Sequence, residues 1–226
     1  MRGQKNVLIV AAHPDDEVFG CGGTIARHVA EGDKVDTFFL ADGVSSRDEY
    51  MNDQNKERIN AAIKAAEILG ADKPRFACFP DNKMDTVPLL DVIKEIELAV
   101  EELKPNIVYT HHGSDLNIDH RLTQEAVMTA CRPFPGSTIM AIYSFETVSS
   151  TEWAPPNMGP KFQPSRFVEI SEFMEQKRLA LECYSTEMRD FPHARSYEGV
   201  NALSRLRGTS VGVSDAEAFE ILREIV

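Results

Sequence analysis

Cysteine is scarce in this sequence, and positive charge is in the minority. The 226 residues include four cysteines, which lie far apart and form no Cys-x-x-Cys pair, so neither a disulfide-rich scaffold nor a cysteine-based metal site is indicated. Reduced, mostly buried thiols are expected instead. Asp and Glu number 36 against 24 Lys and Arg, and the formal net charge of −12 argues against binding to nucleic-acid phosphates or to an anionic membrane.

Long hydrophobic runs are also missing. The apolar run at 6–12 is too short for the core of a signal peptide or for a membrane span, and no later segment is apolar for long enough to cross a bilayer. Hydrophobic residues nevertheless make up 42% of the chain, which is enough to bury a core. We therefore expect a globular, cytoplasmic protein that does not insert into a membrane.

Strand and helix patterns alternate along the first two thirds of the chain. Short apolar runs predict strands, and apolar residues at helical spacing predict helices. The strands are expected at 6–12, 35–41, 75–79, 106–110 and 139–147, and the helices at 17–30, 52–69, 89–103 and 122–131. This alternation is typical of βαβ units, so we expect an α/β fold with a mostly parallel sheet and helices on both of its faces.

The pattern changes after residue 148. Residues 149–166 are rich in proline and polar residues and predict a loop. Beyond it, a short strand and three helices are expected, at 167–170, 173–184, 197–206 and 215–225. We expect one domain over 1–226, with a core over about 1–148 and a loop-rich, helical extension over about 149–226. The only tryptophan, Trp153, is expected to be a lid that stacks on a ligand, or else a plug in the core.

Two segments rich in histidine and aspartate follow predicted strands. The first, AHPDDE at 12–17, places His13 and Asp16 three residues apart, close enough to reach one ion across a strand-to-helix turn. The second, THHGSDLNIDHR at 110–121, stands at the end of the fourth predicted strand. Ligands bind at the carboxyl ends of parallel strands, so both segments meet there if the first and fourth strands are neighbours. Imidazole and carboxylate are normal zinc ligands, and three of them leave a position for water.

Each of these residues also has a structural interpretation. A single histidine at a strand end, such as His13, is often a hydrogen-bonded core residue. Asp16 can act as a helix N-cap, and Asp15 as a solvated charge in a first helical turn. The presence of two such segments favours the metal site. Gly20, Gly22 and Gly23, which follow the first of these segments, lack the spacing of a phosphate-binding loop and indicate close packing of the first helix.

Several short motifs occur together over nearly the whole chain. AHPDDE is followed by Gly-Gly-Thr, Asp-Gly, Leu-Gly and Asp-His-Arg and by the C-terminal segment RGTSVGVSDAEAFE, at 22–24, 42–43, 69–70, 119–121 and 207–220. In this combination the chain resembles the PIG-L or LmbE-like deacetylases. The resemblance implies a Rossmann-like, three-layer α/β/α fold, one zinc ion per chain and assembly into a homo-oligomer. It also implies hydrolysis of the N-acetyl group of a glucosamine-type sugar or a related amide.

Carried over by position, the resemblance implies a set of metal ligands and a general base. His13, Asp16 and His120 match the ligands, a set that also suits other divalent ions such as iron or manganese. Asp15 matches the base that takes a proton from water and then passes one to the departing amine. Zinc at such a site polarises an amide carbonyl and makes water a better nucleophile at neutral pH.

The remaining roles match the family less closely. Arg58 and Asp81 match positions that contact the sugar, although Arg58 can also be a surface arginine of a helix. Many members carry a second histidine three residues before the last ligand, where this chain has Asn117. Asn117, His112 or His111 is therefore expected to donate the hydrogen bond that stabilises the developing oxyanion.

Three functions fit these observations. The first is a zinc-dependent N-deacetylase acting on a small N-acetylated sugar, free or conjugated. The second is a zinc amidase that cleaves a larger amide or thiol conjugate with the same metal site. The third is a sugar- or nucleotide-binding α/β module with a structural metal. Structural zinc is usually enclosed by four protein ligands, often cysteines, and no cysteine lies beside either His-rich motif, so we favour an enzyme.

Overall fold

The computed structural model describes residues 3–43 and 52–226 and is built around one mixed sheet. Its strands are β1 (Asn6–Ala11), β2 (Lys34–Ala41), β3 (Arg75–Phe79), β4 (Ile107–His111), β5 (Ala141–Phe145), β6 (Arg166–Glu169) and β7 (Ala216–Glu224). Across the sheet they follow the order β3-β2-β1-β4-β5-β7-β6. β1 to β5 run parallel, whereas β7 pairs antiparallel with both β5 and β6.

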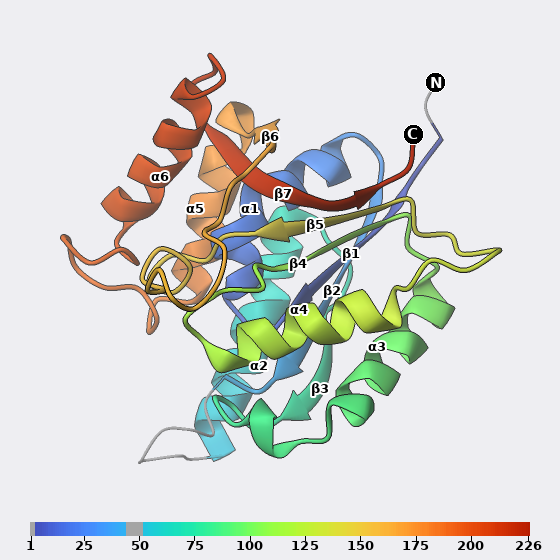
Figure 1. Cartoon of the computed structure of the whole chain (residues 1–226). Coiled ribbons are helices and arrows are strands. Elements are labelled where there is room, and N and C mark those ends of the chain that lie inside the picture. Colours follow the sequence, from blue (N-terminus) through green and yellow to red (C-terminus); the bar gives the residue numbers. More distant parts are fainter. Residues whose placement is uncertain (1–2, 44–51) are drawn as a thin grey trace.

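Helices cover both faces of this sheet (Figure 1). They are α1 (Asp16–Ala30), α2 (Asn52–Leu69), α3 (Leu89–Leu103), α4 (Ile118–Ala130), α5 (Met174–Cys183) and α6 (Tyr197–Thr209), with short 3-10 turns at Met84–Thr86 and Ser171–Phe173. α3 and α4 pack together on one face, and α1, α2, α5 and α6 lie on the other. The predicted three-layer α/β/α arrangement with a mostly parallel sheet is confirmed.

The central strands are apolar on both sides because each face of the sheet has its own core. In β1, Val7 and Ile9 belong to the cluster shared with α1 and α2, whereas Leu8 and Val10 belong to the cluster shared with α3 and α4. Successive residues of a strand point to opposite faces, so a continuous apolar run is what a doubly covered strand requires. β1 also pairs in parallel with β4, as expected, which brings the carboxyl ends of the two strands side by side.

The prediction of a helix at 215–225 was wrong, because this segment forms β7. Alanine, glutamate and leucine are good helix formers, which explains the error. In the structure, the backbone of β7 pairs with the edge of β5, which would otherwise be left open. Phe219 packs edge-to-face against Tyr109, with ring centroids 5.0 Å apart. Tertiary contacts therefore override the local preference, and residues after 149 supply two strands to the sheet.

Glycines let α1 approach the rest of the protein closely, as the sequence indicated. A Cβ added at Gly23 would lie 2.6 Å from the Cβ of Ile170, and one at Gly20 would collide with the ring of Phe145. The close approach fixes the position of α1, whose first residue is Asp16. Among the described helices, none combines the length and apolar character needed to span a bilayer. The four cysteines are free thiols, and Cys21 and Cys131 among them are buried.

Candidate active site and metal centre

The two His- and Asp-rich motifs meet at the carboxyl ends of β1 and β4. His13 follows β1, Asp16 begins α1, and His120 lies in the first turn of α4. One potential ligand atom from each of these three side chains lies within 4.8 Å of the other two, and all three residues are buried. The imidazole centroids of His13 and His120 are 5.4 Å apart. Residues more than 100 positions apart in the sequence thus form one compact cluster.

Each of the two histidines is held between Asp16 and a second carboxylate. His13 places Nδ1 3.2 Å from Oδ2 of Asp16 and Nε2 3.0 Å from Oδ2 of Asp119. His120 places Nε2 3.3 Å from the same Asp16 oxygen and Nδ1 3.1 Å from Oδ1 of Asp115. Metal-binding histidines characteristically carry a carboxylate on the nitrogen that does not face the metal, because it fixes ring orientation and tautomer. This geometry leaves Nδ1 of His13 and Nε2 of His120 facing Asp16.

The electrostatics of the cluster also suit a cation. Oδ1 of Asp16 is buried without a hydrogen-bond partner, which is costly for a carboxylate oxygen. Although burial lowers the pKa of His120, the carboxylates of Asp16 and Asp115 raise it to about 9. The imidazole nitrogens and carboxylate oxygens that bind protons in this cluster can bind a divalent ion instead. The residues present therefore fit the zinc ion that the family resemblance implies.

A second possible group of ligands shares His13 but fits a cation less well. Nε2 of His13 also lies 3.1 Å from Oδ1 of Asp81, and His13, Asp81 and Asp119 together could hold an ion. Both oxygens of Asp119, however, already accept backbone N–H groups, from Asn82 at 2.7 Å and from Met84 at 3.1 Å. Asp119 is thus a satisfied carboxylate that orients His13, whereas Asp16 retains an oxygen without a partner.

Asp15 lies beside the cluster in a strained backbone conformation. It precedes α1 with φ of 125°, a value that residues other than glycine rarely adopt. Its N–H donates to Oε2 of Glu17 at 2.9 Å, and the hydroxyl of Tyr184 donates to Oε1 of Glu17 at 2.6 Å. Glu17 and Tyr184 therefore hold the backbone of Asp15 in place. The pKa of Asp15 is raised, because burial outweighs the opposing effect of Arg58 and Arg195.

Two arginines bind the same oxygen of Asp15. Nη2 of Arg58 lies 3.0 Å from Oδ2, and Nη1 of Arg195 lies 3.1 Å from it. Both arginines also approach Glu187, at 2.7 Å and 3.6 Å, so two guanidinium groups and two carboxylates form a closed ring of ion pairs. Arg58 is buried in this ring, so the alternative of a surface arginine was wrong. Arg195 and Glu187 come from the segment after α5, which carries no recognisable motif.

The two adjacent histidines at the end of β4 point in opposite directions. His111 stacks on His120, with centroids 3.9 Å apart, and its Nε2 accepts the N–H of Ala12 at 2.9 Å. His112 instead contacts Oε2 of Glu220 through Nδ1 at 2.8 Å and donates from Nε2 to the carbonyl of Pro160. Strand geometry requires this divergence. The structure thus brings His111, not His112, into the cluster.

Asn117 starts α4 as its N-cap. Its side-chain oxygen accepts the N–H of Asp119 at 2.8 Å, and its Nδ2 donates to Oδ1 of Asn82 at 3.0 Å. This cap explains why α4 begins at Ile118, one turn before the predicted start. The Asn117 side chain lies next to the cluster, but its hydrogen bonds go to the loop after β3 and to its own helix.

Sequence reasoning missed the residues that support His120. Asp115, which holds Nδ1 of His120, accepts hydrogen bonds from the hydroxyls of Ser150 and Thr151, the latter at 2.6 Å. Asp115 lies inside the second His-rich motif, so its position in the sequence could have suggested a role at the site. Ser150 and Thr151 come from the proline-rich segment after β5, which carried no such signal.

Comparisons with known proteins agree with this geometry. The family model described as PIG-L, GlcNAc-PI de-N-acetylase, matches residues 8–131. The uncharacterized deacetylase YaiS of Escherichia coli is 30% identical over 182 residues, covering 78% of this chain and 88% of that protein. Diacetylchitobiose deacetylase of Thermococcus kodakarensis is 29% identical over 81% of this chain and 70% of its own length. A 4-oxalmesaconate hydratase of Pseudomonas putida is 28% identical over 80% of this chain and 73% of its own length.

A solved structure extends the likeness to the complete fold. The protein TT1542 of Thermus thermophilus superposes with a TM-score of 0.77 at 27% identity, covering 99% of this chain and 97% of that one. The family match spans more than half of the chain and includes most of β1, all of β4 and α4, and both His-rich motifs. The chain therefore belongs to the PIG-L family, the GlcNAc-PI de-N-acetylases.

Proposed function

We propose that this protein is a zinc-dependent hydrolase that removes the N-acetyl group from an N-acetylglucosamine-type amino sugar or sugar conjugate. The observation that carries the proposal is the buried cluster of His13, Asp16 and His120, in which each imidazole is fixed from behind by a carboxylate while Asp16 keeps one oxygen without a partner. Membership of the family and relatives named as deacetylases support it. We further propose that the enzyme acts in the cytoplasm as a homo-oligomer.

His13, Asp16 and His120 would hold the metal, through the two imidazole nitrogens that face Asp16 and the Asp16 carboxylate. When bound, zinc supplies Lewis-acid chemistry at the acetyl carbonyl and makes water more acidic. No cysteine belongs to this ligand set, so the donors are nitrogen and oxygen. Because iron and manganese accept the same donors, the choice of zinc is part of the proposal.

Asp15 is the proposed general base. Both arginines bind Oδ2, so we assign Oδ1 to the proton of the attacking water. The water oxygen then bonds to the acyl carbon, the carbon–nitrogen bond breaks, and Asp15 returns the proton to the departing amine nitrogen, which leaves acetate and a free amino sugar. A carboxyl whose pKa is raised by burial is better matched to both proton transfers near neutral pH than a solvated one.

Asn117 is the proposed hydrogen-bond donor to the developing oxyanion. Its Nδ2 bonds the exposed amide of Asn82, a partner that a substrate oxygen can replace. Of the two other expected donors, His111 accepts the N–H of Ala12 through Nε2, and His112 has both ring nitrogens engaged with groups outside the cluster, so we prefer Asn117. We propose that Asp81, next to His13, accepts hydrogen bonds from the sugar, and that Arg58 acts through Asp15, which its guanidinium contacts directly.

A substrate panel tests the proposal. Metal-loaded enzyme is incubated with N-acetylglucosamine, N,N'-diacetylchitobiose, an acylated aminothiol conjugate and 4-oxalmesaconate, and acetate, other acids and free amine are measured. Stoichiometric acetate and amine from the sugars are expected. Release of a different acid would identify an amidase, and consumption of 4-oxalmesaconate without amine release would identify a hydratase. Binding of a sugar with no turnover would instead favour a binding module.

A further inference from the structure

Two segments from different parts of the chain contact the proposed catalytic cluster. In the first, which follows β5, Thr151 donates to Asp115, the carboxylate that orients His120. In the second, which follows α5, Arg195 contacts Asp15 and donates from Nε to Oγ of Ser149 at 2.8 Å. The two segments are thus tied to the site and to each other.

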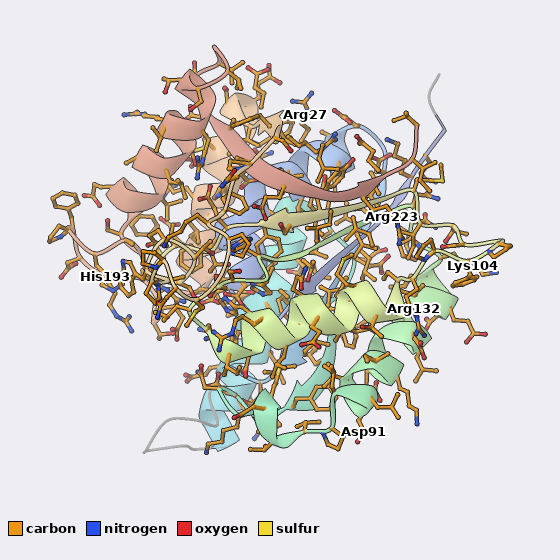
Figure 2. All side chains as sticks on the ribbon, in the orientation of Figure 1. Arg27, Asp91, Lys104, Arg132, His193 and Arg223 are labelled. Atoms are coloured by element: carbon orange, nitrogen blue, oxygen red, sulfur yellow. The ribbon has the colours of Figure 1, made fainter. Side chains whose placement is uncertain are left out.

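Trp153 and His193 join the same two segments further out. Their ring centroids lie 5.5 Å apart with an interplanar angle of 77°, so one ring meets the other edge-on. Trp153 lies two residues after Thr151, and His193 two residues before Arg195, whose N–H donates to Nδ1 of His193 at 3.0 Å. Figure 2 places His193 on the side of the molecule toward which β5 points in Figure 1. The aromatic pair therefore lies at the rim of the site.

Exposure to solvent increases from the cluster to this rim. The side chain of Asp15 is 2% exposed and that of Arg195 is 21% exposed, whereas Trp153 as a whole residue is 50% exposed. Trp153 is therefore not a core plug, and the apolar surface of its indole is available to a ligand that extends outward from the metal ligands. Contact with His193 restricts the indole, so little side-chain freedom remains to be lost on binding.

We propose that Trp153 forms a subsite for a second pyranose ring, the one attached to the sugar that loses its acetyl group. The proposal rests on the proposed deacetylase function. An indole presents a flat apolar surface with one polar edge, which suits the C–H face of a sugar ring whose hydroxyls need hydrogen bonds around it. Glu152 and Arg195 supply such polar groups nearby. A lipid chain would instead require a continuous apolar patch.

The sequence offers a direct probe, because Trp153 is the only tryptophan. Its fluorescence is recorded while metal-loaded enzyme carrying Asp15→Asn, which prevents turnover, is titrated with N,N'-diacetylchitobiose or with N-acetylglucosamine. Binding is measured in parallel by calorimetry. The disaccharide is expected to shift or quench the emission on saturation, whereas the monosaccharide leaves it unchanged. Emission that stays constant while calorimetry shows disaccharide binding, or no disaccharide binding at all, overturns the subsite.

Steady-state kinetics separate the subsite from the chemistry. Trp153→Ala is expected to raise the KM for the disaccharide by roughly five- to ten-fold, to leave that for the monosaccharide unchanged, and to be largely rescued in Trp153→Phe. Leu98→Ala, an exposed position on α3, is the matched control and should change neither KM. An equal effect on both sugars would contradict the proposal. If wild-type enzyme releases no acetate from either sugar, the proposed function fails, and the fluorescence titration alone then decides the subsite.

Discussion

Replacing Asp15 by asparagine should separate proton transfer from metal binding. The side chain of Asp15 contacts Arg58 and Arg195, whereas the two histidine nitrogens assigned to the metal face Asp16. Asparagine keeps the size of the side chain but cannot take a proton from water. General acid–base catalysis contributes about 10²- to 10⁴-fold, or about 2.7–5.5 kcal/mol of barrier, and Asp15 is assigned both proton transfers. We therefore expect kcat to fall by about 10³-fold or more with one metal still bound per chain.

The matched control is Asp115→Asn, which should show the opposite behaviour. Asp115 contacts Nδ1 of His120 and not the proposed water site, so its loss should weaken metal affinity about 10- to 100-fold. Excess zinc should then restore most of the turnover in this variant, but none in Asp15→Asn. Metal content is measured by mass spectrometry and activity by acetate release over a range of free zinc. An Asp15→Asn enzyme within about ten-fold of wild type, or one that lost its metal, would refute the assignment.

Three further substitutions test the supporting structure. Gly23→Ala should reduce the free energy of unfolding by about 1–3 kcal/mol, because the added Cβ would meet Ile170, and so lower the Tm measured in thermal unfolding. An unchanged Tm would contradict the tight packing of α1. Tyr184→Phe, which removes the hydroxyl that holds Glu17, should lower kcat while KM and metal content stay constant; an unaltered kcat would remove this bond from the positioning of the base. Burial lowers the pKa of His112, but its partner Glu220 on β7 raises this pKa above 6.5 overall. The stabilisation of the fold by this ion pair is therefore present below pH 6.5 and is lost as the pH rises through the raised pKa of His112. His112→Gln should therefore cost on the order of 1 kcal/mol in unfolding at about pH 6 and much less at about pH 9, and an equal loss at both would contradict the ion pair.

Elements whose residue types agree with their surroundings could be predicted from the sequence. The apolar run at 6–12 requires burial on both faces, and β1 occupies Asn6–Ala11 between two cores. The helix expected at 52–69 has the bounds of α2, because Gly70 adopts the positive φ that ends a helix. His13 and Asp16 could be singled out because a buried strand end rarely carries such polar groups without a use.

Residues whose role depends on distant partners could not be found in this way. β7 consists largely of good helix formers, and its pairing with β5 and β6 makes it a strand. Arg195 meets Asp15 across 180 positions of sequence, in a segment without a recognisable motif. The choice between His111 and His112 depends on the exact phase of β4, which the sequence does not specify.

X-ray absorption spectroscopy at the zinc edge of the zinc-loaded protein tests most directly whether His13, Asp16 and His120 bind one cation. One zinc per chain is expected, with scattering from two imidazoles at about 2.0–2.1 Å and from oxygen at about 2.0–2.2 Å, and loss of that signal in His120→Ala. A sulfur shell at about 2.3 Å, or an unchanged spectrum in His120→Ala, would contradict this set of metal ligands.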